Sequence, residues 1–494
     1  MEKLKRKILK HDNIIMFFLM LLLSSSFLLA VPLDANDELW NFSNIYKMVN
    51  GYQIYEDLNV IVTPLFFLIG KIILELFGAN YLVFRIYGVV ILNTGISYLI
   101  YQIFKKLKMK TIHAMFFTIF FMIVQMMVLL NGFYNYLAIL FVLLGIFLEL
   151  KINDNKKYKS IIQGVITFAI FLSKQNVVVL YLLGRILYFL IKYGKKDAKK
   201  IFLELTTSAI CLILFLMSLY ITNNLPAFLD YTVGGLNEFS KNNIFGSISG
   251  LITIIAEVGI SIFMIWMAKN KKIPLKEQER NHILLLASIS LFMLGIAYPI
   301  FNTAHVFMGS VIFIVMMIYI LDLLVFKPLL YTEKMNKIKE WLLIVSVVML
   351  LGSNLWYNMY QIKRLEEYSY GLGSPYYGVL VEEEKRKEID EILQYIEQEE
   401  QAGRNVKIIS YYANLYMNLL GRNNGEMDLP FYGNLGKDGE DGLIEQIKQL
   451  KNTKILILTQ EDENYQESKK VMNYIKENYP KEGEIRQFSI YYAE

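Results

Sequence analysis

Three carboxylates stand close together near the amino-terminal end of the chain, directly after a long apolar run. They are Asp34, Asp37 and Glu38, in the segment Asp34-Ala35-Asn36-Asp37-Glu38-Leu39-Trp40. A carboxylate held at a membrane surface can act as a general base that removes a proton from a hydroxyl group. The alternative is a helix start, in which Asp34 or Asn36 caps the helix while Asp37 and Glu38 complement its dipole.

Apolar runs recur along most of the chain, and they must set the positions of these polar groups. Hydrophobic residues make up 55% of the sequence and charged residues only 19%, so a purely soluble protein is excluded. The pattern predicts a mainly α, polytopic membrane protein with about 11 spans. The predicted spans are 14–33, 81–104, 112–130, 136–150, 160–173, 176–193, 201–222, 246–267, 282–299, 306–326 and 340–356.

Lysine and arginine cluster in every second connection, which predicts the side of the membrane on which each connection lies. The first run is too long for the apolar part of a signal peptide, so we expect a retained helix rather than a cleaved one. The amino terminus is then inside, whereas segment 34–80 and the tail 357–494 are outside. Charge spaced between apolar runs is a topology signal, which excludes a nucleic-acid partner. The basic connections are 1–13, 105–110, 151–159, 192–200, 268–281 and 327–339, whereas the others before the tail hold Lys47, Lys71, Lys174 and Lys241.

The outer connection 34–80 is expected to hold two amphipathic helices at the membrane interface. In the first, Leu39, Phe42 and Ile45 recur at helical spacing up to Met48. The second covers 63–78, with Lys71 and Glu75 at i,i+4 spacing as a surface ion pair. A short tilted crossing is the alternative for 63–78, but it would invert every later side assignment.

The tail 357–494 is predicted to be a separate small α/β domain that folds alone, and 1–356 to be the membrane domain. Helical patterns alternate with short β-type runs in the tail, which favours a layered α/β arrangement. The loop 420–436 is rich in Gly and Asn, and either binds a ligand or only connects elements. The expected helices are 381–401, 443–450 and 468–479, and the expected strands are 406–410 and 454–459.

The order of motifs in residues 1 to about 110 resembles the GT-C superfamily of polyprenyl-phosphate-dependent membrane glycosyltransferases. The resemblance is closest to the branch of bacterial aminoarabinose transferases and protein O-mannosyltransferases. It is carried by a first span followed by Asp37-Glu38, then Gly51-Tyr52-Gln53-Ile54-Tyr55-Glu56-Asp57, Thr63-Pro64-Leu65-Phe66, Leu76-Phe77-Gly78, and Arg85 at the start of the next span.

The resemblance implies transfer of a sugar, with inversion, from a polyprenyl-phosphate donor to a cell-envelope glycan, lipid or protein at the outer face of the cell membrane. Asp37 is at the position of the general base, and Glu38 would orient the acceptor or the helix. Tyr55 and Asp57 are then expected to contact substrate. The departing phosphate needs cations on the side opposite the base.

Three cations, Arg85, Lys174 and Lys71, fit the phosphate side of such a site, although a surface pair with Glu75 accounts better for Lys71. Arg85 lies about a turn inside its predicted span, where a charge must be paired or reach the interface. Lys174, followed by Gln175 in Ser173-Lys174-Gln175-Asn176, lies between two short spans and matches a lysine of the family; its alternative role is snorkelling to the interface. His305 begins a span on the outer side and would line the site, or else form an interface hydrogen bond.

Two positions depart from the aminoarabinose branch. Thr63 stands where that branch has a lysine, so other cations must bind the donor phosphate. The segment Asn131-Gly132-Phe133-Tyr134-Asn135 lacks the acidic residue that relatives often carry. An amide cannot ligate a cation as a carboxylate does, which argues against a divalent metal, and the sequence identifies no cofactor with certainty.

Two other functions stay open. Glu257 and Arg185 lie within predicted spans, and charges at such depth are typical of transporters or lipid flippases. However, inverted repeats and paired broken helices are not visible in the sequence. The second of these functions is that of a non-catalytic membrane scaffold whose outer domain binds a partner. The single Cys211 excludes an internal disulfide framework.

Overall fold

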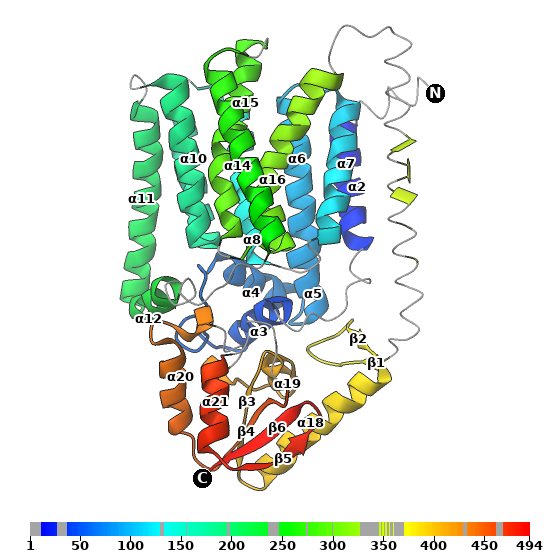
Figure 1. Ribbon diagram of the computed structural model, residues 1–494, viewed down its shortest axis with the longest axis vertical. Coiled ribbons are helices and arrows are strands. Elements are labelled where there is room, and N and C mark those ends of the chain that lie inside the picture. The colour runs from blue at the N-terminus through cyan, green and yellow to red at the C-terminus, as the bar shows by residue number, and fades with distance from the viewer. Residues whose placement is uncertain are drawn as a thin grey trace.

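The computed structural model is mainly helical, with a small sheet near the carboxyl terminus (Figure 1). It describes residues 11–26, 37–128, 133–154, 156–194, 198–235, 247–272, 275–298, 300–326, 370–427, 432–460 and 468–494, with isolated positions between 345 and 359. The predicted spans 14–33 and 340–356 therefore lie partly outside the described residues.

Within the described ranges, eight helices are long and apolar enough to cross a membrane, judged by length and composition. One of them joins α5 (Tyr81–Arg85), η1 (Ile86–Ile91) and α6 (Leu92–Lys106) into Tyr81–Lys106. Two shorter apolar helices, α2 (Asp12–Ser26) and α9 (Tyr158–Ser173), belong to the same bundle. The remaining long helices are α7 (Thr111–Val128), α8 (Tyr134–Lys151), α10 (Gln175–Tyr193), α11 (Ala198–Ile221), α14 (Ile248–Lys269), α15 (Glu277–Met293) with η3 (Leu294–Ala297), and α16 (Thr303–Leu321) with η4 (Asp322–Phe326).

The bundle leaves large apolar surfaces uncovered on its peripheral helices. On α11, Ile213 and Leu214 are more than half exposed, and on α14 so are Ile252 and Phe263. Apolar patches of this extent are rare on soluble monomers, because they are unfavourable in water. The arrangement therefore fits a multi-pass membrane protein whose outer helices face lipid.

The two ends of the bundle differ. The helices α6, α10 and α14 end, and α7, α11 and α15 begin, at the end remote from the C-terminal domain (Figure 1). These turns are the lysine-rich connections of the sequence. The described basic connections between these helices and the C-terminal domain thus occupy opposite ends of the bundle (Figure 1).

The first connection forms two helices that lie across the domain-side end of the bundle (Figure 1). The first, α3 (Asp37–Val49), begins at Asp37 and is buried on almost every side. The second, α4 (Leu65–Phe77), buries Phe66 and Leu74 and exposes Ile72 and Leu76. Thirteen residues span only about 20 Å as a helix, which is too short to cross the bilayer core. The predicted surface pair is present, with Lys71 Nζ 3.7 Å from Glu75 Oε1.

The C-terminal part is an α/β unit, as predicted. Its four-stranded sheet has the order β3-β4-β6-β5, with β3 and β4 parallel and the other neighbours antiparallel. A two-stranded β1-β2 ribbon precedes it. The elements are β1 (Tyr370–Gly371), β2 (Leu380–Val381), α18 (Glu383–Gln401), β3 (Asn405–Ile409), α19 (Ala413–Leu419), η5 (Gly425–Met427), η6 (Tyr432–Leu435), α20 (Gly439–Lys448), β4 (Thr453–Leu458), α21 (Lys469–Asn478), β5 (Lys481–Ile485) and β6 (Phe488–Ala493).

The two faces of this sheet have different surroundings. On one face, Ile455 and Ile457 of β4 pack with Leu443 of α20 and Ile475 of α21 in a core of their own. On the other face, the buried residues of α18 and α19 belong to the same continuous core as α3 and the bundle. The C-terminal unit therefore has a core of its own and also shares a core with the first connection. The prediction of a tail that folds alone did not include this shared core.

Candidate active site

A buried ion pair fixes the first turn of α3 to the bundle. Arg85 donates from Nε to Glu38 Oε1 at 2.9 Å and from Nη2 to Glu38 Oε2 at 3.0 Å. Glu38 is fully buried and Arg85 nearly so, and the guanidinium lies 4.9 Å from the centre of the Tyr81 ring. A two-pronged contact of this kind fixes orientation as well as distance. Glu38 is therefore an orienting residue for α3, and Arg85 is its partner.

Asp37 is the first residue of α3 and is half-buried beside this ion pair. Its charge acts on Tyr134, at the start of α8, and on Lys174, between α9 and α10. Segments far apart in the sequence thus meet around one carboxylate. Asp37 is thus both the first residue of a helix and part of a polar centre. The helix-start and general-base interpretations of Asp37 are therefore compatible.

Lys174 supplies a cation that interacts electrostatically with Asp37. Its Nζ donates to Asn135 Oδ1 at 2.6 Å and lies 5.3 Å from the centre of the Tyr134 ring. Burial lowers the pKa of Lys174 to about 8, although the charge of Asp37 opposes this shift. The lysine is thus a desolvated cation held by a neutral amide, a setting in which it can bind an anion strongly.

His305 and Gln175 adjoin this lysine. The charge of Lys174 acts on His305, whose Nδ1 lies 2.8 Å from Asn302 Oδ1. Gln175 donates from Nε2 to the carbonyls of Ile61 at 2.8 Å and Thr232 at 3.2 Å. Gln175 therefore ties the first connection to the segment after α11.

Tyr55 and Asp57 lie in the first connection, and the Tyr55 ring packs edge-on against Phe228, in the segment after α11, with ring centres 5.2 Å apart. The Tyr55 hydroxyl donates to the carbonyl of Val62 at 2.8 Å, and burial raises its pKa. Asp57 is exposed and accepts from the backbone N–H of Gln53 at 2.7 Å. No described contact joins either residue to Asp37 or Lys174, so their expected role in substrate binding remains a prediction.

Thr63 stands where the aminoarabinose branch that the sequence resembles has a lysine. Its hydroxyl donates to the carbonyl of Phe171 on α9 at 2.6 Å, and the residue is fully buried. A lysine here would have to bury its charge without a described carboxylate partner, which is strongly unfavourable. Lys174 is instead the cation that the structure brings to this region.

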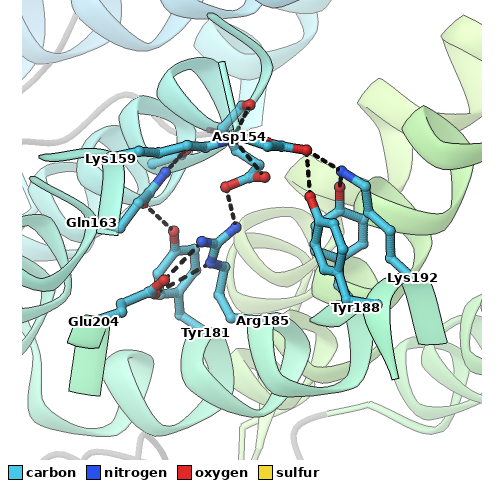
Figure 2. Close-up of polar contacts among 11 residues, drawn as sticks. Asp154, Lys159, Gln163, Tyr181, Arg185, Tyr188, Lys192 and Glu204 are labelled. Atoms are coloured by element: carbon cyan, nitrogen blue, oxygen red, sulfur yellow. Dashed lines mark hydrogen bonds and ion pairs between the residues drawn. The ribbon is translucent and has the colours of Figure 1, made fainter. Parts of the chain in front are cut away.

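A second polar centre lies at the other end of the bundle, around Arg185 (Figure 2). Arg185 donates to Glu149 Oε2 at 2.9 Å and to Glu204 Oε2 at 2.8 Å. Lys159 bridges Glu149 at 2.9 Å and Asp154 at 2.6 Å. Neighbouring cations hold the pKa of Asp154 below its usual range against the effect of burial. The network joins α8, α9, α10 and α11, and sequence reasoning found only Arg185, because partners this far apart follow from packing alone.

A groove of about 590 Å³ opens beside this network. Glu149, Asp154 and Lys192 line one side, and Glu277 and His282 of α15 line the other. Glu149 follows Asn135 by fourteen residues on α8, which places the groove about 21 Å along the helix from the Lys174 centre. The groove is therefore separate from the Asp37 site.

Glu257, the other charge within a predicted span, accepts a hydrogen bond from Ser310 of α16 at 2.6 Å. Among the described residues, no three His, Cys, Asp or Glu side chains gather closely enough to hold a metal ion.

Comparisons with known proteins complete the description of the site. No model of a protein family matches the chain, and no curated protein matches it.

Proposed function

We propose that this protein is an integral membrane glycosyltransferase. It moves a sugar from a polyprenyl-phosphate donor to a hydroxyl group of a cell-envelope acceptor at the outer face of the membrane. The observation that carries the proposal is the electrostatic interaction between a half-buried carboxylate, Asp37, and the desolvated Lys174, whose Nζ donates to Asn135 Oδ1 at 2.6 Å at the domain-side end of the bundle. The ion pair of Glu38 with Arg85 holds the helix that presents Asp37.

In the proposed reaction, Asp37 accepts the proton of the acceptor hydroxyl while that oxygen attacks the anomeric carbon. The bond between the anomeric carbon and the phosphate oxygen breaks, and the phosphate leaves with the bonding electrons. Lys174 stabilises the negative charge on the departing phosphate. The first turn of α10, which follows Lys174 directly, adds the positive end of a helix dipole. Attack opposite the leaving group inverts the anomeric configuration.

The proposal requires the C-terminal domain to lie outside the cell. Cysteine replacements are introduced in a Cys211→Ser background at exposed positions, and an impermeant maleimide is added to intact cells. Asn473→Cys on α21 should be labelled, whereas Lys157→Cys and Asn270→Cys in the basic connections should be labelled only after lysis. Labelling of Lys157→Cys in intact cells would contradict the orientation.

The pKa of Lys174 predicts how donor binding depends on pH. The phosphate binds the protonated lysine, and this side chain loses its proton near pH 8 rather than near its ordinary value. Donor affinity should be constant well below pH 8 and fall about tenfold per pH unit above it. The measurement is donor binding across pH 6 to 10. Lys174→Arg stays protonated and should remove the fall. An unchanged fall in Lys174→Arg would assign it to another group.

The direct experiment is mass spectrometry of lipids that copurify with the full chain. We expect a polyprenyl phosphate or its sugar-linked form from wild type, and much less from Lys174→Met. Recovery of ordinary phospholipids alone in both samples would contradict the proposal. Arg185 and Glu257, the two charges behind the transporter alternative, have hydrogen-bonded partners in neighbouring helices; paired charges at this depth are compatible with a structural role and with transport.

A further inference from the structure

We infer that the C-terminal domain positions the catalytic helix, and that Asn414 of α19 is the residue through which it does so. This rests on the proposed function, because the helix that it holds is α3, which carries Asp37 and Glu38. In Figure 1, α19 lies directly below α3, and the two helices are in contact.

A buried polar cluster joins the two helices. Ser43 of α3 shares its one hydroxyl proton between Asn414 Oδ1 at 2.7 Å and Asn418 Oδ1 at 3.1 Å. Lys47 of α3 donates to Asn414 Oδ1 at 3.4 Å. The exposed fraction of each of these four residues is 3% or less. Asn414 therefore accepts from two successive turns of α3 in a region that excludes water.

An aromatic contact continues from this cluster toward the ion pair. Asn418 donates from Nδ2 to the Tyr376 hydroxyl at 2.9 Å, and the Tyr376 ring packs against Phe42 of α3 and against Tyr81. The backbone N–H of Tyr81 donates to the carbonyl of Pro375 at 2.9 Å. Tyr81 in turn lies against the guanidinium of Arg85, the partner of Glu38. The C-terminal domain thus contacts both helices that form the ion pair.

The polar character of this contact is what gives it a positioning role. Apolar surfaces tolerate small sliding movements, whereas buried hydrogen bonds are satisfied in one arrangement and are costly to leave unmade. Lys47 adds to this cost, because a buried ammonium group needs acceptors. Asp37 is six residues before Ser43 on the same short helix, so a shift at Ser43 moves the carboxylate with it.

Asn414 offers a sharp substitution test, because its two amide atoms have different surroundings. Oδ1 accepts from α3, whereas Nδ2 is buried without a partner among the described residues. Asn414→Asp keeps the acceptor, loses no described hydrogen bond at Nδ2, and adds a buried negative charge that the neighbouring Lys47 ammonium group compensates. Asn414→Leu has a similar size and removes the acceptor. Asn473→Leu, at an exposed position on α21, is the matched control.

The first measurement is amide hydrogen exchange across α3 in the full chain, reconstituted in lipid nanodiscs. Asn414→Leu should raise exchange in residues 37–49 by about tenfold or more, while Asn414→Asp and Asn473→Leu stay within about twofold of wild type. Unchanged exchange in Asn414→Leu would overturn the inference. If Asn414→Leu does not fold, Ser43→Ala removes the hydroxyl from the α3 side, and unchanged exchange in that variant would overturn it equally.

The second measurement is sugar transfer from a synthetic polyprenyl-phosphate donor by the same variants. In Asn414→Leu, the displaced base should lower kcat by about tenfold or more while the donor KM is unchanged. Asn414→Asp should keep the wild-type kcat. Equal kcat in Asn414→Leu and wild type would overturn the catalytic part of the inference. If wild type itself transfers no sugar, the proposed function fails, whereas the exchange result on α3 stands by itself.

Discussion

Replacing Asp37 by asparagine should lower the rate of sugar transfer by about 10² to 10⁴, the loss that follows removal of a positioned general base. Asparagine has the same size and still stabilises a helix start, so the change should cost little stability. Glu38 keeps its ion pair with Arg85, which leaves α3 in place. Steady-state transfer by the purified variant, together with its melting temperature and donor affinity, separates the loss of catalysis from a loss of folding.

The control for this variant is Asp438→Asn, at an exposed position in the C-terminal domain, which should transfer sugar at the wild-type rate. Asp34→Asn should also transfer sugar at close to the wild-type rate, since Asp34 is closer to the first span and is not at the position that the resemblance implies for the base. If Asp57→Asn abolished transfer while Asp37→Asn did not, the base would be Asp57. If none of these carboxylates mattered, the proposed chemistry would be wrong.

Replacing Arg185 by methionine should destabilise the bundle by about 3 to 5 kcal/mol, because it leaves a buried carboxylate without its cation. Glu204 is almost fully buried and loses both hydrogen bonds, whereas Glu149 keeps Lys159. The measurement is the thermal unfolding of the purified protein in detergent. Lys387→Met, which changes an exposed cation of the C-terminal domain, should be nearly silent.

The double variant Arg185→Met with Glu204→Met tests the origin of this loss. It removes both partners and fills their space with apolar atoms, so most of the stability should return. If the double variant is as unstable as Arg185→Met alone, the loss of stability comes from lost packing around the arginine and not from the unpaired carboxylate of Glu204.

Local sequence patterns predicted most of the helices but not all of the sheet. The bundle helices follow from uninterrupted apolar runs, and the start of α3 follows from the carboxylates at its first turn. The hairpin of β5 and β6 was missed. Strand β5 is Lys481-Glu482-Gly483-Glu484-Ile485, an edge strand whose charged side chains face solvent and leave no alternating apolar pattern.

The candidate site was predictable only in part, because partners across the fold depend on packing. The position of Arg85 inside a span indicated that its charge must be paired, but nothing local identified Glu38, forty-seven residues earlier. In the sequence, Asn135 belongs to a segment that lacks an acidic residue. In the structure, its side-chain amide accepts a hydrogen bond from Lys174. The contact of Asn414 with Ser43 joins residues 371 positions apart, and no sequence pattern points to it.

The stereochemistry of a single turnover tests the central claim most directly. The purified full chain in nanodiscs is given a polyprenyl-phosphate sugar of known anomeric configuration with an envelope lipid extract as the source of acceptor, and the product is analysed by nuclear magnetic resonance. The account predicts a glycoside of inverted configuration from wild type and almost none from Asp37→Asn. A product of retained configuration, or equal transfer by the two proteins, would contradict it.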